Sequence, residues 1–307
     1  MPNLPMLSPN MPPDKMQVLR AAAQQLQGVN RVVAVVLGGS YALSTARPDS
    51  DIDMGIYYRE SSPLPIVQIR SIARSICTPG TDPVVTELYG WGPWVNGGAW
   101  IQTPVGKVDF LYRNLEQVQR VIDEGRQGVW RHDFDQQPLY GFRSVVYFGE
   151  SSICIPLYNP QGEIARLKDL VATYPEPLKD CVIQDSLWNA ELSLRFCRTF
   201  AVQATCITQP DALTRVAQLL VHALFALNEV YFVSDKYATK LIKRFKLAPP
   251  DFARRLARVL SHPGGDSSEL YRSVELLEAL WRETVALTDG QYKPHYDLKV
   301  SLPAGRE

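Results

Sequence analysis

Two aspartates occupy alternate positions in an apolar run of the sequence, Asp51-Ile52-Asp53-Met54. Side chains at positions i and i+2 of a β-strand project from the same face, so Asp51 and Asp53 are expected to lie side by side. Adjacent carboxylates repel each other unless a cation lies between them. Mg²⁺ is typically held by one or two carboxylates together with phosphate oxygens of a substrate, so this pair predicts a magnesium site.

A third carboxylate fits the same site. Asp109 stands between Val108 and Phe110 in another strand-like run, and an acid inside an otherwise buried strand requires a partner. If this strand lies beside the strand of Asp53, a cluster of three carboxylates results. Such a cluster can hold two metal ions ~3.5–4 Å apart, an arrangement that serves nucleotidyl and phosphoryl transfer.

The general base of such a reaction would be a carboxylate. The first histidine of the chain is His132, which lies beyond the segment that holds the three aspartates, and a base must be within hydrogen-bond reach of the proton it removes. Asp109 is the first candidate. Glu87, on a predicted strand, and Glu191, in a predicted long helix, are the alternatives.

A glycine pair between these elements could contact phosphate groups. Residues 32–37 form a continuous apolar run typical of a strand that is buried on both faces, and Gly38, Gly39 and Ser40 follow it directly. A backbone without side chains can approach a phosphate and direct N–H groups at it, and Ser40 adds a hydroxyl donor. Glycine pairs and Asp-Ser-Asp runs are each more often simple turns. Their combination with buried acids favours a phosphate and metal site.

These residues are positioned by elements of two kinds. Helices are predicted over 14–26, 66–77 and 115–124, strands over 32–37, 52–58 and 84–89, and a hairpin over 99–112. Strands and helices around one sheet predict an α/β or α+β domain. Beyond about residue 162 the apolar residues recur at helical spacing, which predicts an all-α helical bundle with helices over 183–201, 213–230, 237–245, 251–260 and 269–287. We therefore expect a disordered arm (1–13), a catalytic domain (14–150) and a helical domain (151–307).

Composition narrows the class of protein. Lys plus Arg is 32 and Asp plus Glu is 32, and this zero net charge argues mildly against binding dominated by nucleic acid. A basic stripe in the helical domain would reverse that judgement. No apolar stretch approaches the ~20 residues of a membrane span, so we expect a cytoplasmic protein with no membrane partner. The five cysteines include no CxxC pair, which favours buried free thiols.

The segment Gly90–Trp100 holds three tryptophans and four glycines in eleven residues. Such a segment is typical of a loop. Its indole rings could stack on a base or a flat substrate, or they could anchor the loop by packing on the second domain. The sequence favours neither interpretation.

These motifs together resemble a known signature. Gly39-Ser40, ten residues, Asp51-Ile52-Asp53 and a later Asp109 on a strand are similar to the pattern of the DNA polymerase β-type nucleotidyltransferase superfamily, which includes aminoglycoside and lincosamide nucleotidyltransferases. The resemblance covers about residues 32–113. It implies a catalytic domain with a mixed β-sheet, followed by a helical domain that closes over the nucleotide. It also implies that Gly39 and Ser40 bind the triphosphate, that the three aspartates bind metal, and that Lys236 reaches the nucleotide phosphates.

The function expected from these observations is Mg²⁺-dependent nucleotidyl transfer. A nucleoside monophosphate, expected to be AMP from ATP, would pass to a hydroxyl of a small-molecule acceptor with release of pyrophosphate. Asp51, Asp53 and Asp109 would hold two ions, and Gly38, Gly39, Ser40 and Lys236 would bind the nucleotide. The alternatives are a toxin-like enzyme that modifies tRNA or protein, and a nucleotide-binding module without turnover.

Overall fold

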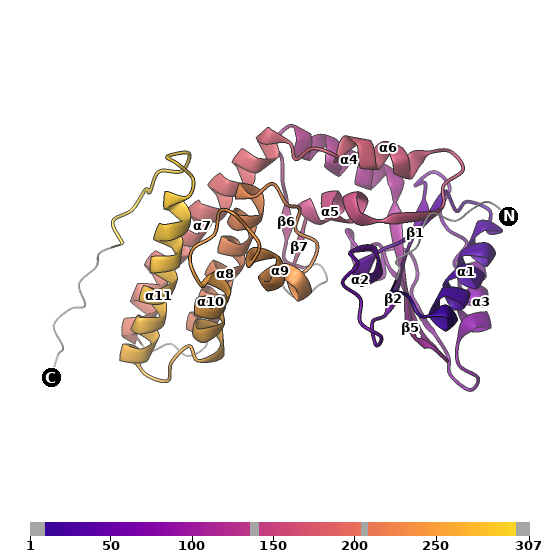
Figure 1. Cartoon of the computed structure of the whole chain (residues 1–307), viewed down its shortest axis with the longest axis horizontal. Helices are drawn as coiled ribbons and strands as arrows, with labels where there is room; N and C mark the ends of the chain where they lie inside the picture. Colours follow the sequence, from indigo (N-terminus) through magenta and orange to yellow (C-terminus); the bar gives the residue numbers. More distant parts are fainter. Residues whose placement is uncertain (1–9, 136–140, 204–207, 299–307) are drawn as a thin grey trace. The chain divides into compact units, whose positions relative to one another are not determined.

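A computed structural model describes residues 10–135, 141–203 and 208–298 of the chain (Figure 1). The expected disordered arm, residues 1–13, lies outside the described residues up to residue 9. Beyond that point the expectation is wrong, because Met11 is buried in a hydrophobic core and Pro13 begins helix α1 (Pro13–Gln27). Proline is well tolerated at this first helical position, where its missing N–H has no partner inside the helix.

The chain forms two compact units. The sheet unit consists of the chain up to Gly125 together with Trp130–Thr173. The helical unit consists of the short segment Arg126–Val129 together with the residues from Tyr174 onward. The division expected at residues 150 and 151 instead falls inside helix α5 (Val145–Ile153). The sheet unit extends further because the last strand of its sheet follows this helix.

The sheet unit is built on a mixed sheet, as the sequence predicted. The strand order is β3-β4-β5-β2-β1-β8. Only β2 and β5 pair in parallel; the other neighbours are antiparallel. The six strands are β1 (Ala34–Leu37), β2 (Ile52–Tyr58), β3 (Val84–Val85), β4 (Gly98–Thr103), β5 (Gly106–Asn114) and β8 (Ile155–Tyr158).

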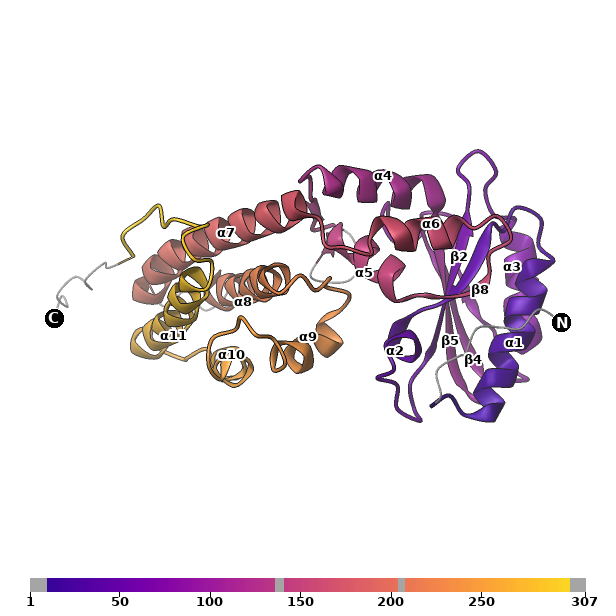
Figure 2. The same ribbon diagram turned by 45° about the horizontal axis from the view of Figure 1, so that its top comes forward.

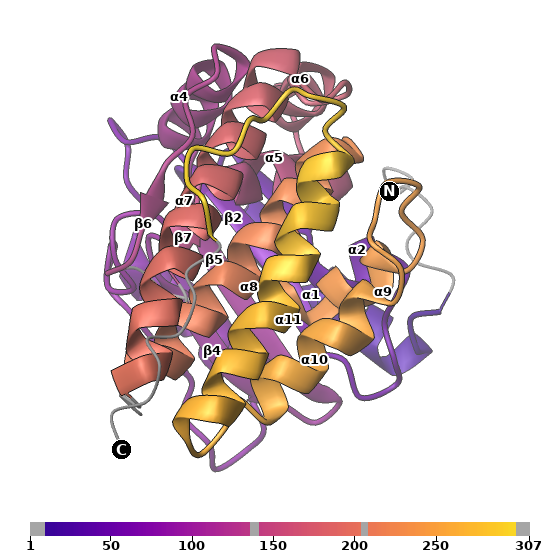
Figure 3. The same cartoon turned by 90° about the vertical axis from the view of Figure 1, so that its left-hand side faces the viewer.

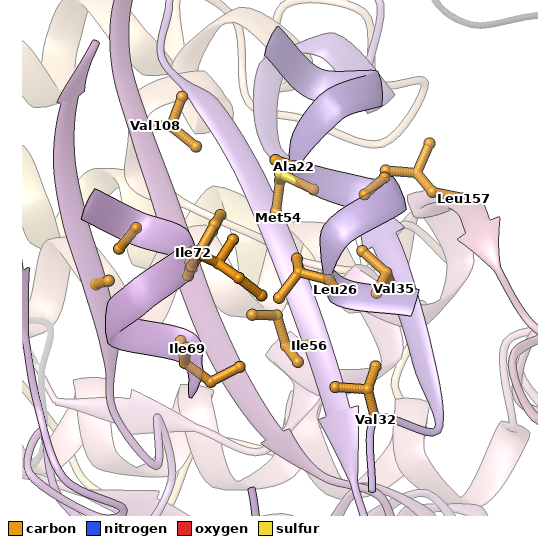
Figure 4. Close-up of a cluster of buried hydrophobic side chains, with 14 of the residues drawn as sticks. Ala22, Leu26, Val32, Val35, Met54, Ile56, Ile69, Ile72, Val108 and Leu157 are labelled. Carbon is orange, nitrogen blue, oxygen red and sulfur yellow. The ribbon is translucent and has the colours of Figure 1, made fainter. Parts of the chain in front are cut away.

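Two helices cover one face of this sheet. Helix α1 and helix α3 (Ile66–Ile76) lie on that side, whereas α2 (Gly39–Ala42) and α5 lie on the other side (Figure 2). Met54 and Ile56 of β2 project toward α1 and α3 and are fully buried with their neighbours (Figure 4). Because side chains alternate along a strand, the opposite face of β2 is left for Asp53.

The predicted strand over 84–89 is wrong beyond Val85. The chain leaves the sheet there and turns, and Tyr89 has a positive φ of 61°, which is incompatible with a continuing strand. The helix predicted over 115–124 is confirmed as α4 (Leu115–Arg126). Elements that were not predicted follow it: the paired strands β6 (His132–Asp133) and β7 (Phe142–Arg143), and α6 (Glu163–Leu170).

The helical unit is the bundle that the sequence predicted. Helices α7, α8 and α11 lie side by side, with α10 against α11 (Figure 3). Trp281 of α11 is buried in this interface, and its indole N–H donates to the carbonyl of Leu187 in α7 over 3.0 Å. The helices are α7 (Glu176–Gln203), α8 (Thr208–Leu227), α9 (Asp235–Ile242), α10 (Phe252–Ser261) and α11 (Ser267–Ala286).

The free cysteines agree in part with the sequence analysis. Cys154 and Cys197 are buried, whereas Cys77 and Cys181 are only half-buried. Burial raises the pKa of the Cys154 thiol to about 11, so this thiol is protonated at neutral pH. Cys206 lies outside the described residues. No helix in the described ranges is both long enough and apolar enough to span a membrane.

Candidate active site

Parallel pairing of β2 with β5 brings two of the expected carboxylates together. Asp53 is the register partner of Asp109, and paired residues of neighbouring strands project from the same face. Asp51 stands two positions before Asp53, directly ahead of β2. We name Asp51, Asp53 and Asp109 the carboxylate site. It lies on the sheet face opposite α1 and α3, because the alternate residues of both strands fill the core.

A lysine that the sequence analysis missed belongs to this site. The Lys107 ammonium lies 2.9 Å from an oxygen of Asp109 and 3.9 Å from an oxygen of Asp51. Lys107 precedes Asp109 by two residues on β5, so both side chains share a face. The spacing of two residues between Lys107 and Asp109 was the sequence signal that could have identified this lysine. The structure therefore holds one positive charge between two of the three carboxylates.

The carboxylate site fits a hard divalent cation in its chemistry. Within the described ranges, no group of three or more His, Cys, Asp or Glu side chains is arranged to hold a metal ion. The donors are nevertheless carboxylate oxygens, which Mg²⁺ prefers, and the Lys107 ammonium already occupies a cation position between Asp51 and Asp109. Binding of two ions stays a prediction.

The second glycine of the pair is required by its contact with the carboxylate site. Gly39 has a φ of +57°, and a Cβ built on it would lie 2.6 Å from the Asp53 Cγ. Both the backbone conformation and the lack of space disfavour any larger residue, which would displace the Asp53 side chain. The Gly38 N–H donates to the Asp53 carbonyl over 2.9 Å. The glycine pair is thus fixed directly against Asp53.

Ser40 follows the glycine pair directly. It is buried and belongs to the short helix α2. Its carbonyl accepts a hydrogen bond from the Thr45 N–H over 3.0 Å, which closes the turn after the glycines. Six of the seven expected site residues therefore lie in the sheet unit, around the ends of β1, β2 and β5. Their roles in binding stay predictions.

A buried lysine holds the segment that leads into Asp51. Lys15 of α1 is only 5% exposed. Its ammonium donates to the carbonyls of Pro48 over 2.9 Å and Ser50 over 2.6 Å. Lys15 shares the buried stripe of α1 with Leu19, four residues later, so a charged residue on an apolar helix face was the signal that sequence analysis overlooked.

Lys15→Met is expected to reduce the free energy of unfolding by about 1–3 kcal/mol, because the carbonyls of Pro48 and Ser50 lose the charged donor that the buried Lys15 supplies. Methionine keeps the length and apolar stem of the side chain. Thermal denaturation measures this loss, and turnover should fall as well, because the backbone before Asp51 is released. An unchanged melting temperature would contradict the anchoring role. Arg20→Met, at an exposed position of the same helix, is the control.

Two other expected residues, Lys236 and Glu87, belong to other parts of the chain. Lys236 belongs to the helical unit, where its side chain is exposed and its backbone N–H donates to the Ser234 hydroxyl over 3.1 Å. The Glu87 side chain is 75% exposed and accepts from Arg70 over 3.1 Å. Glu87 also lies beyond the end of β3, so its expected position on a strand is wrong.

Glu191 is removed from the candidate bases by its surroundings. Its carboxylate is 0% exposed in the helical unit. It accepts hydrogen bonds from the Tyr292 hydroxyl and from the backbone N–H groups of His295 and Tyr296, at 2.8 Å for His295. A buried carboxylate with these donors stabilises the segment that follows α11. Its role is structural.

Residues 16–124 match the family model of the nucleotidyltransferase domain. No curated protein matches the chain. Among solved structures, the chain is similar to a nucleotidyltransferase-like protein from Exiguobacterium sibiricum 255-15, with 12% sequence identity and a TM-score of 0.43. That similarity covers 90% of this chain and 77% of the other.

Proposed function

We propose that the protein transfers a nucleoside monophosphate to a hydroxyl of a small-molecule acceptor, a proposal supported by the match of residues 16–124 to the nucleotidyltransferase domain model. The donor is a nucleoside triphosphate, with ATP as the donor to test first, and pyrophosphate is released. Cytoplasmic location and dependence on Mg²⁺ are parts of this proposal.

One observation carries the proposal: the glycine pair and two aligned carboxylates meet on one face of the sheet. Gly39 lies against the Asp53 side chain, and Asp53 is in register with Asp109. Glycine backbone favours close approach of phosphate groups, and neighbouring carboxylates favour a cation. The contact between these elements supports a site for a nucleoside triphosphate with a divalent ion.

The reaction is a displacement at the α-phosphorus. The acceptor oxygen forms a bond to that phosphorus, while the bond from the phosphorus to the oxygen bridging to the β-phosphate breaks and pyrophosphate leaves with the bonding electrons. The hydroxyl proton passes to a carboxylate, for which Asp109 is the candidate.

Mg²⁺ held by Asp51, Asp53 and Asp109 would offset the negative charge of the phosphates when it is bound. Lys107 balances the carboxylates until then. Gly38, Gly39 and Ser40 bind the departing phosphates, and a role for Lys236 in nucleotide binding stays a prediction.

The test is incubation of the purified protein with each of the four α-³²P-labelled nucleoside triphosphates and Mg²⁺, with and without a cell extract. We expect label on a small metabolite and stoichiometric release of pyrophosphate. Both should vanish in Asp51→Asn, which keeps the shape of the side chain and removes its charge. Mg²⁺-dependent binding without pyrophosphate release under any condition would replace this proposal with that of a nucleotide-binding module.

A specific observation favours RNA as a second candidate acceptor. Residues 235–258, which include α9 and α10, contain eight Lys or Arg and two Asp, a formal charge of +6 in a chain of zero net charge. We name these eight side chains the basic surface. Within the described residues, Arg254 pairs with Asp251 and Arg255 pairs with Glu283. Among the described side chains, no ion pair is found for Lys236, Lys240, Lys243, Arg244, Lys246 or Arg258.

A groove of about 440 Å³ lies on the basic surface, lined in part by Lys243 and Arg254. Such clustering supports binding to a phosphate backbone. Lys240→Glu with Lys243→Glu is expected to weaken tRNA binding and to lower the slope of log K against log salt by about 0.7–0.9 for each phosphate that is no longer neutralised. Arg20→Glu with Arg120→Glu changes the net charge equally on the sheet unit and serves as the control. Equal effects of the two variants would exclude a role for the basic surface.

A further inference from the structure

Most of the tryptophan-rich segment is a loop anchored on the sheet unit itself, and its last three residues belong to β4. The Trp94 indole N–H donates to Asp133 over 2.9 Å, and the ring stacks on Phe142 with centroids 5.1 Å apart. Asn96 is fully buried and donates to the Gln117 side chain over 3.0 Å. These partners all belong to the sheet unit, so Trp94 and Asn96 fix the loop independently of the helical unit.

The other two tryptophans of the segment have a different environment. Trp91 and Trp100 stack on each other with ring centroids 4.9 Å apart and an interplanar angle of 27°. A Cβ on Gly98 would lie 2.6 Å from the Trp91 ring, so glycine at this position lets the ring rest on β4. Trp100 retains 42% of its surface exposed. We name Trp91 and Trp100 the indole pair.

The indole pair lies beside the carboxylate site. Trp100 of β4 is the register partner of Asp109 on β5, so the two side chains project from the same face of neighbouring strands. The Lys107 ammonium, which contacts Asp109, also lies 5.7 Å from the centre of the Trp100 ring. An exposed aromatic surface therefore borders the carboxylates directly.

The order of the strands determines on which side of the carboxylates the indole pair lies. Across the sheet, Gly39 follows β1, Asp53 lies on β2, Asp109 on β5 and Trp100 on β4. Neighbouring strands are about 4.8 Å apart, so Trp100 lies one strand beyond Asp109 and about three strands from the glycine pair. In an in-line displacement the attacking and leaving oxygens lie on opposite sides of the phosphorus. If pyrophosphate departs toward Gly39, the acceptor arrives from the side of Trp100.

From this geometry we propose that the indole pair is the stacking surface for a planar ring of the acceptor, such as a nucleobase or another heteroaromatic ring. The inference rests on the proposed function, because it takes the glycine pair as the triphosphate side. Indole faces bind planar rings by stacking, with little demand on the identity of the ring. The ring on Trp100 orients the acceptor so that its hydroxyl lies near Asp109.

The test uses ¹⁵N-tryptophan labelling, because the chain has six tryptophans and hence six indole N–H signals. Variants assign the signals. Adenosine is titrated into the full-length protein with the donor side saturated by a non-hydrolysable ATP analogue and Mg²⁺, and sorbitol serves as a polyol without a planar ring. We expect adenosine to shift the Trp100 and Trp91 signals and sorbitol to leave them unchanged. The signal of Trp188, which is 38% exposed on α7, should not move.

The affinity for adenosine gives the second readout. Trp100→Ala is expected to weaken it roughly 5- to 150-fold, the range of one stacking contact. Trp100→Phe should keep most of the affinity, and Trp188→Ala should keep all of it. The proposal is overturned if Trp100 does not respond, if sorbitol acts like adenosine, or if the ATP analogue abolishes the shift, since the ring would then belong to the donor.

This experiment separates the two proposals. Binding of adenosine to the indole pair requires no turnover, so it can be observed even if none of the labelled triphosphates is consumed. In that case the acceptor surface stands and the transfer reaction does not. Conversely, pyrophosphate release that depends on Asp51, without a response of Trp100 to any planar ring, would retain the reaction and reject the indole pair.

Discussion

Asp53→Asn is expected to lower the rate of nucleotidyl transfer by at least about 10³-fold, equivalent to about 4 kcal/mol of transition-state stabilisation. Asparagine has nearly the same shape, so it can keep the contact with Gly39. The substitution removes one of the negative charges that attract the divalent ion. Pyrophosphate release measures the rate, and calorimetric titration with Mg²⁺ in the presence of nucleotide should show weaker binding.

A matched control for Asp53→Asn is available four residues earlier. The Asp49 side chain is 69% exposed and forms an ion pair with Arg47 at 2.9 Å, so Asp49→Asn removes the same charge outside the carboxylate site. It should leave the rate within about threefold, since Asp49 lies outside the carboxylate site and an exposed ion pair is screened by solvent. Equal losses in both variants would mean that the charge of Asp53 has no special role. Circular dichroism checks that each variant is folded.

Gly39→Ala is expected to reduce transfer at least about 100-fold and the free energy of unfolding by about 1–3 kcal/mol. Two effects combine at this position. Alanine is disfavoured at a φ of +57°, and its Cβ would collide with the Asp53 carboxylate. The carboxylate must move to make room, so Asp53 leaves its alignment with Asp109.

Gly80→Ala separates these two effects. Gly80 has a φ of +84°, and nothing lies within 4 Å of a Cβ built on it. This variant therefore carries a backbone strain like that of Gly39→Ala, of about 1–2 kcal/mol, without a collision. We expect it to lower the melting temperature and to leave transfer unchanged. If Gly39→Ala behaves in the same way, the contact between Gly39 and Asp53 does not matter for the reaction.

The sequence by itself determined which residues could form the site and which face of their strands they occupy. Asp51 and Asp53 alternate with apolar residues, and a strand cannot bury both sets, so the carboxylates had to lie opposite the core. The long helices of the second half were predicted for the same reason, because their apolar residues recur with the period of a helix. In both cases the signal lies within a few consecutive residues.

The neighbours of these elements were decided only by the tertiary structure. The parallel register of β2 with β5 joins Asp53 to Asp109 across 55 intervening residues, and the pairing of β8 with β1 moves the end of the sheet unit to Thr173. Strand pairing has no local signal of this kind, because its hydrogen bonds are made by backbone groups that every residue type carries.

The same distinction explains the charged residues that were missed or misjudged. Lys15, Lys107 and Glu191 are each ordinary in sequence, and their roles follow from partners that only the fold supplies: two loop carbonyls, two carboxylates and the backbone of residues 295 and 296. Hydrophobic periodicity is local and can be read along the chain. A buried charge is stabilised by groups distant in sequence, so its role is determined only when the chain has folded.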